Sequence, residues 1–148
     1  MTDDTVKAKG KLSIVLTGPD GIIKDTREVD NLVVTTGLNF ISSRMKDATA
    51  TVMSHMEVGT TSTAASLAQT TLIAAVAASR TALSSTTVTT SSVAYACTFG
   101  AGVGTGALVE AGIFNAASAG TMLCRTTFSA INKAVADSLL ITWTVTVS

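Results

Sequence analysis

The sequence predicts an all-β, mainly antiparallel fold, a β-sandwich or jelly-roll-like barrel, with one short helix near residues 37–47. Two observations lead to this prediction. Strand-length segments follow one another at intervals of roughly 8 to 15 residues, separated by turn-forming residues. The last segment, residues 139–147, alternates strictly between two faces, and one of these faces is apolar. We therefore expect a half-buried C-terminal strand that carries the single tryptophan, Trp143, on its apolar face.

A single β domain is expected over residues 11–148, preceded by a flexible N-terminal arm over residues 1–10. The arm is polar and charged and shows no periodicity. A chain of 148 residues has the length of one ordinary domain, and it contains no internal repeat or linker. Five residues on apolar strand faces or at strand ends are expected in the core: Trp143, Ile141, Val145, Phe114 and Phe128.

A hairpin is expected to open the domain. Residues 11–17 alternate, and the strand returns over residues 22–30. Between them, residues 18–21 (GPDG) favour a turn, because proline presets φ and glycine accepts a positive φ.

The helix is expected over residues 37–47. Leu38, Ile41 and Met45 recur at helical spacing and form one apolar stripe. Thr36 is placed to cap the helix N-terminus. A helix of at most three turns is expected to cover one end or side of the β core.

The other strands are less regular. Residues 66–74 fit either a short helical turn or an extended connection, and we assign them to neither. The remaining strands are expected at residues 52–58, 75–83, 87–99, 106–114, 121–128 and 139–147.

Charged residues are scarce for a soluble domain. They make up 14 % of the chain, against an average of about 25 %, and the mean hydropathy is +0.48. A surface of threonine, serine and alanine is poorly protected against association. We expect a protein that lives in an assembly and associates with itself as a dimer or trimer.

Several classes of partner and compartment are disfavoured. Ten basic residues balance ten acidic ones, so no net field attracts the chain to nucleic acid or to an anionic membrane. No uncharged apolar run reaches 18 residues, and the acidic N-terminus is unlike a signal peptide. We expect a cytosol-like compartment, in which Cys97 and Cys124 are small core residues and form neither a disulfide nor a metal site.

No motif for catalysis, cofactor binding or metal binding stands out. The glycine-rich residues 100–106 lack the Lys-Ser or Lys-Thr of a nucleotide loop, and a strand-connecting loop is the simpler interpretation. His55 is the only histidine, so a metal site would lack ligands, and no Gly-x-Ser-x-Gly elbow activates a serine. We expect no enzyme activity, no cofactor and no metal.

Glu110 lies in an otherwise apolar segment, ALVEAGIF. A carboxylate there must reach solvent or find a partner, because an unpaired buried charge is costly. Arg80 or Arg125 is expected to supply a bidentate partner from a neighbouring strand. We interpret Glu110 as one half of a structural ion pair.

Five segments together resemble a domain that recurs in structural proteins of tailed bacteriophages. They follow the order and spacing of that family's motifs and lie within residues 31–148: VGTTSTAASLA at 58–68, EAGIFN at 110–115, TMLCRTTF at 121–128, INK at 131–133 and DSLLITWTVTV at 137–147. The family's domains resemble small β modules of capsid cement proteins and of tail or fibre-associated proteins.

The resemblance implies a virion protein assembled in the host cytoplasm. The leading hypothesis is a cement or decoration protein that binds the major capsid protein on the outer shell and stabilises it. The alternatives are a tail, baseplate or fibre-adaptor subunit and, more remotely, a small-ligand-binding β barrel with a hollow interior. Four residues of the N-terminal arm are candidates for contact with a neighbouring subunit: Val6, Lys7, Lys9 and Lys11.

Overall fold

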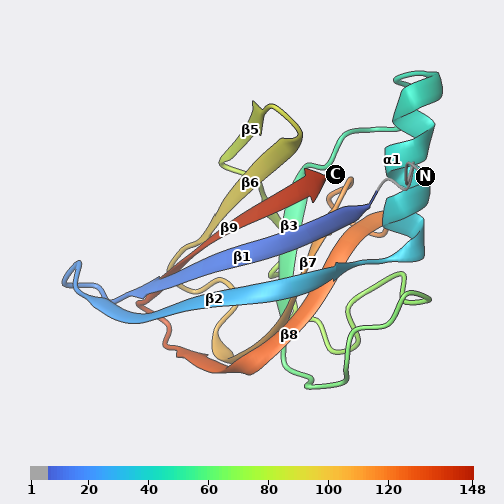
Figure 1. Cartoon of the computed structure of the whole chain (residues 1–148). Coiled ribbons are helices and arrows are strands. Elements are labelled where there is room, and N and C mark those ends of the chain that lie inside the picture. The colour runs from blue at the N-terminus through green and yellow to red at the C-terminus, as the bar shows by residue number, and fades with distance from the viewer. Residues whose placement is uncertain (1–6) are drawn as a thin grey trace.

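The computed structural model describes residues 7–148, and the predicted all-β, mainly antiparallel fold is confirmed (Figure 1). Within these residues one curled sheet of nine strands forms a half-barrel, and every pair of neighbouring strands is antiparallel. The order across the sheet is β4-β3-β7-β8-β2-β1-β9-β6-β5. In chain order the elements are β1 (Ala8–Thr17), β2 (Ile23–Val33), α1 (Thr35–Lys46), β3 (His55–Gly59), β4 (Thr81–Ala82), β5 (Ser85–Thr89), β6 (Ser92–Phe99), β7 (Gly106–Phe114), β8 (Met122–Lys133) and β9 (Ser138–Val147).

The two margins of the sheet are joined by a very short link. Strands β4 and β5 lie at opposite ends of the strand order, yet only Leu83 and Ser84 separate them along the chain. The Leu83 N–H donates to the carbonyl oxygen of Ser54 at 2.8 Å, and the Ser84 N–H donates to that of Ala96 on β6 at 2.8 Å. This link forces the sheet to curl until its margins approach each other.

The core fills the inside of the curled sheet. Trp143 on β9 is fully buried and lies in register between Leu12 on β1 and Tyr95 on β6. The expected core residues Ile141 and Val145 are buried here too, whereas Phe114, also buried, belongs to a smaller cluster outside this core. Phe128 is only half-buried, because β2 pairs with β8 at no more than two positions and leaves the later part of β8 at a gap in the sheet.

Helix α1 differs from the prediction at its start and in its packing. It begins at Thr35 with Val34 as N-cap, and the Thr36 hydroxyl donates instead to the carbonyl oxygen of Met122 at 2.9 Å. Gly37 rests so closely on β8 that an added Cβ would collide with the backbone of Leu123. Within the expected apolar stripe only Ile41 packs against the core, since Leu38 and Met45 are exposed.

Two expected strands in the middle of the chain are wrong in extent. Residues 75–83 form only the short strand β4 and one isolated bridge between Ala75 and Gly59. Residues 87–99 are not one strand, because the chain reverses at Thr90, whose φ is +50°, to make the β5–β6 hairpin. The run is rich in threonine and serine and lacks the glycine or proline that marks a turn in sequence.

Two strand starts also differ. The strand expected from residue 52 begins at His55 as β3. Strand β1 begins at Ala8, so residues 8–10 belong to the sheet and pair with β9. The predicted arm over residues 1–10 is therefore too long at its C-terminal end, and its first six residues lie outside the described part of the chain.

A short turn between β8 and β9 is held by the buried carboxylate of Asp137. Lys24 Nζ donates to Asp137 Oδ2 at 2.8 Å, and the Ala134 N–H donates to the same oxygen at 2.9 Å. Chiefly through the Lys24 hydrogen bond, and secondarily through the Ala134 N–H, these contacts hold the pKa of Asp137 below its usual value.

The burial of Trp143 predicts an asymmetry between neighbouring positions of β9. Trp143→Ala should lower the free energy of unfolding by roughly 3 to 5 kcal/mol, because it opens a large cavity in the core. Thr144→Ala, on the opposite and partly exposed face, should cost about 1 kcal/mol or less. Chemical denaturation of both variants measures these losses, and equal small losses would contradict the assigned faces.

The depressed pKa of Asp137 predicts a pH-dependent contribution to stability. Asp137→Asn should destabilise the protein at neutral pH, where the parent carboxylate is ionised in the folded and unfolded states. The difference should shrink as the pH falls below about 4, since protonation removes the interaction from the parent chain. Urea denaturation of both proteins between pH 7 and pH 2 tests this, and a difference that does not vary with pH would contradict it.

Candidate interaction surface

A buried ion pair lies on the outer side of β7 and β8. Arg125 donates through Nε at 3.0 Å and Nη2 at 2.6 Å to Glu110 Oε2, and both side chains are fully buried. The two residues are diagonal neighbours in the ladder, since Gly112 pairs with Arg125. Of the two partners expected for Glu110, the structure therefore selects Arg125.

The ion pair anchors the long connection between β3 and β4. Glu110 accepts the Ala74 N–H at 2.7 Å and the Ile73 N–H at 3.2 Å, and Arg125 Nη1 donates to Gln69 Oε1 at 3.0 Å. Gly59 passes so close that an added Cβ would collide with the Glu110 carboxylate. Residues 60–80, part of which we left unassigned, thus form a fixed outer layer on β7 and β8.

Apolar packing and a second ion pair hold the rest of this layer. Leu72 packs with Val34, Phe114 and Met122 in a small cluster outside the main core. Arg80, the other partner considered for Glu110, pairs instead with Glu57 at 3.3 Å and lies over the Phe114 ring, 3.7 Å from its centre. It is placed at the far end of the connection, which explains why it does not reach Glu110.

The exposed side of this layer carries no charge. Between Glu57 and Glu110 the only charged residue is Arg80, and it is engaged in the contacts just described. Leu67 and Ile73 on the connection are about half exposed. The sequence contains this signal as a gap in the charge pattern, whereas the overall composition shows it only as low charge.

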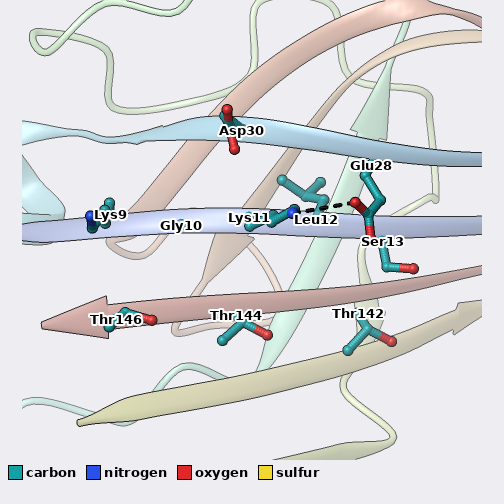
Figure 2. Close-up of a pocket in the computed structure, with 10 residues that line it drawn as sticks. All are labelled: Lys9, Gly10, Lys11, Leu12, Ser13, Glu28, Asp30, Thr142, Thr144 and Thr146. Carbon is teal, nitrogen blue, oxygen red and sulfur yellow. Dashed lines mark ion pairs between the residues drawn. The ribbon is translucent and has the colours of Figure 1, made fainter.

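A groove of about 500 Å³ runs along the outer face of β2, β1 and β9 (Figure 2). Apart from Leu12, its lining side chains are polar or charged, and Lys11 Nζ lies 3.2 Å from Glu28 Oε2. Figure 2 shows Lys9 and Asp30 farther along the same strands, with a row of threonines on β9. The lining side chains are Lys9, Lys11, Ser13, Glu28, Asp30, Thr142, Thr144 and Thr146.

The four candidate contact residues of the predicted arm do not lie together in one flexible segment. Lys9 and Lys11 lie in the β1 strand and line the groove. Lys7 is exposed just before β1, and its backbone exchanges two hydrogen bonds with Ser148. Val6 lies outside the described residues.

A second, apolar cavity of about 420 Å³ opens between α1 and the ends of β5, β6 and β9. Phe40 and Ile41 line it from the helix, Val88 from β5 and Val145 from β9. Tyr95 also lines it, and burial raises the pKa of this phenol to about 12. Besides Tyr95, the polar residues of the lining are Arg44, Thr86 and Ser91, and the rest of it is apolar, so the cavity suits apolar side chains better than a polar ligand.

The other residues that could take part in catalysis or metal binding, Cys97, Cys124 and His55, lie in surroundings that indicate a structural role. Cys97 and Cys124 are buried and unpaired, and burial raises the pKa of each thiol to about 12, which keeps them unreactive. His55 Nδ1 lies 2.7 Å from Ser54 Oγ. Within residues 7–148, no three His, Cys, Asp or Glu side chains are grouped to hold a metal, and no helix has the length and apolarity needed to cross a membrane.

The glycine-rich residues 100–106 connect β6 to β7, as expected. Gly102 and Gly104 adopt positive φ values of +77° and +62°, and the Gly100 carbonyl accepts the buried Lys133 ammonium at 2.9 Å. The loop therefore uses a carbonyl oxygen to bind a cation of the chain itself, whereas a phosphate loop presents N–H groups.

The buried ion pair predicts a large and localised effect of mutation. Glu110→Ala should lower the free energy of unfolding by about 3 to 5 kcal/mol, because Arg125 is left as an unpaired buried charge. Amide exchange at Ile73 and Ala74 should accelerate as the connection loosens.

Two further variants control this experiment. Removing both charges with Glu110→Leu and Arg125→Met should recover much of the stability, but not the slow exchange at Ile73 and Ala74. Glu28→Ala, which breaks the exposed pair with Lys11, should change stability far less. A Glu110→Ala protein as stable as the parent would contradict the role of the ion pair.

Comparison with protein-family models, curated proteins and solved structures gave no match to the chain. Two of the segments that carry the resemblance to phage structural proteins, residues 58–68 and 110–115, meet at the contact between Gly59 and Glu110. A third, residues 121–128, supplies Arg125. In this chain these segments build the support for an exposed, uncharged layer, and that arrangement is the candidate site.

Proposed function

We propose that this chain is a structural protein of a tailed-bacteriophage particle, specifically a cement or decoration protein that binds the outer shell of the capsid and stabilises it. One observation carries the proposal: a fully buried ion pair fixes an exposed layer whose only charged residue, Arg80, is engaged within the fold. The centres of protein interfaces are depleted in charged residues, so such a layer suits contact with a neighbouring subunit. The resemblance of five segments to phage structural domains supports the same class.

Rigidity of the layer favours binding. Association costs entropy when loops become ordered, and a connection already held by Glu110 and Arg125 avoids much of that cost. A decoration protein occupies many symmetry-related sites on one shell. Modest affinity at each site is then sufficient, because the stabilisation of the particle sums over all copies.

The alternative within the same class is a tail, baseplate or fibre-adaptor subunit. It would use the same uncharged layer, and only the location on the particle separates the two. The more remote alternative, a ligand-binding barrel, needs a hollow interior, whereas Trp143, Phe99 and their neighbours fill the inside of the described sheet. The apolar cavity beside α1 is the feature that would serve it.

The proposal predicts that the purified chain binds to particles from which the native copy has been removed. Full-length protein should restore occupancy, measured by quantitative gel analysis and electron microscopy, and should raise the temperature at which the particles release DNA. Copies located on the tail would move the assignment to the tail or baseplate alternative. Particles that neither contain nor bind the protein would overturn both.

Two sets of variants locate the contact. Leu67→Asp and Ile73→Asp place charges on exposed positions of the layer and should reduce occupancy without unfolding the domain. Deleting residues 2–6 tests the arm, since residues 8–10 belong to β1 and must be kept. Lys9→Ala with Lys11→Ala tests the groove in the same assay.

A further inference from the structure

Strand β5 is the least protected strand of the sheet. It is the last strand in the order and pairs only with β6, and all five of its residues, Ser85–Thr89, are exposed. Figure 1 shows the β5–β6 hairpin projecting from the rest of the sheet. In an antiparallel ladder, the N–H and C=O groups of every second residue point away from the paired strand, so β5 presents unpaired backbone groups on its free side.

The usual protection of an edge strand is missing from β5. Natural edge strands carry charges, a proline or a bulge, or are very short. Residues 81–92 contain no charged residue and no proline, and the ladder between β5 and β6 is regular over all five pairs. The opposite margin, β4, has only two residues, so it offers little to pair with.

We propose that β5 pairs with the β5 strand of a second copy of this chain, antiparallel, about a two-fold axis at Thr87. This register uses the whole strand, since Ser85 lies opposite Thr89 and Thr86 opposite Val88. A two-fold arrangement makes each contact twice, and no charges oppose one another. The sheets of the two copies then continue through the junction.

A second observation favours another copy of this chain as the occupant. Thr86 and Val88 line the apolar cavity beside α1, so their side chains face that side of the sheet. In the proposed register the exposed Val88 of each copy lies opposite Thr86 of the other, which brings the apolar cavities of the two copies next to each other. Val88, 71 % exposed in the single chain, thereby loses part of its exposure on both copies.

The pairing does not depend on the proposed virion role, and it is tested on the purified chain alone. Sedimentation over a range of concentrations should show a dimer. Val88→Lys should raise the dimer dissociation constant about tenfold or more, because it places like charges at the junction. Val135→Lys is the matched control, since Val135 is 66 % exposed in the turn between β8 and β9, and it should leave the constant unchanged.

A cross-linking pair tests the register. Thr87→Cys should form an intermolecular disulfide under mild oxidation, because opposite residues at the two-fold lie about 5 Å apart. Ser85→Cys should not, since four residue steps, about 14 Å, separate the two copies of that residue. The native Cys97 and Cys124 are buried and do not interfere.

The outcomes are distinct. A dimer that Val88→Lys weakens and Thr87→Cys links supports the pairing. A monomeric chain, which is the outcome expected if a strand of another protein covers β5, overturns it. A dimer equally weakened by both lysine variants, or linked through Ser85→Cys and not Thr87→Cys, also overturns it. The melting temperature of each variant shows that the domain itself is folded.

Discussion

The outer half of this structure depends on the buried ion pair between Glu110 and Arg125. It sits on the side of β7 and β8 that faces away from the main core, and without a cover it would be exposed to water. Residues 60–80 provide that cover, and the pair in turn gives their backbone and Gln69 hydrogen-bonding partners. The ion pair and the layer therefore stabilise each other, since each supplies hydrogen-bonding partners that the other would lack by itself. The contact admits no side chain at Gly59.

Charge is divided unevenly along the chain, and the division has physical consequences. The first 57 residues hold most of the ionic groups, including those on β1, β2 and α1, and these provide solubility. Between Glu57 and Glu110 only Arg80 is charged, and it is occupied within the fold. Exposed positions of this segment, such as Leu67 and Ile73, therefore leave uncharged surface in contact with water, which the proposed contact with other subunits would cover. The low overall charge of the chain is therefore concentrated in residues 58–109.

The sequence predicted the all-β class, the opening hairpin and the face of β9, because strict alternation and a GPDG turn are strong local signals. The sequence-based prediction was wrong where contacts between distant segments determine the local structure. The helix start is set by Gly37 resting on β8 and not by a cap at Thr36, and the turn at Thr90 lies in a threonine run without glycine. The sequence indicates that Glu110 needs a charged partner. Only the pairing of β7 with β8, which places Arg125 beside Glu110, shows that this partner is Arg125 and not Arg80. The fixed position of residues 60–80 could not be predicted, because it depends on hydrogen bonds to Glu110 and Arg125 and not on a periodic pattern within the segment.

The two margins of the sheet, β4 and β5, differ in length and in how far they are covered, although a two-residue link joins them. The link of Leu83 and Ser84 joins β4 to β5, so the two margins of the curled sheet lie close together. Strand β4 is reduced to two residues and tied to β3, whereas β5 extends with β6 as a hairpin whose far side is open. A fully closed barrel would have no free edge, but this half-barrel keeps two, and the longer of them is β5. That edge is uncharged, which is costly for an isolated protein and useful for one that works in an assembly. The topology of the sheet and the distribution of charge thus coincide at β5, which is the longer of the two margins and carries no charged residue.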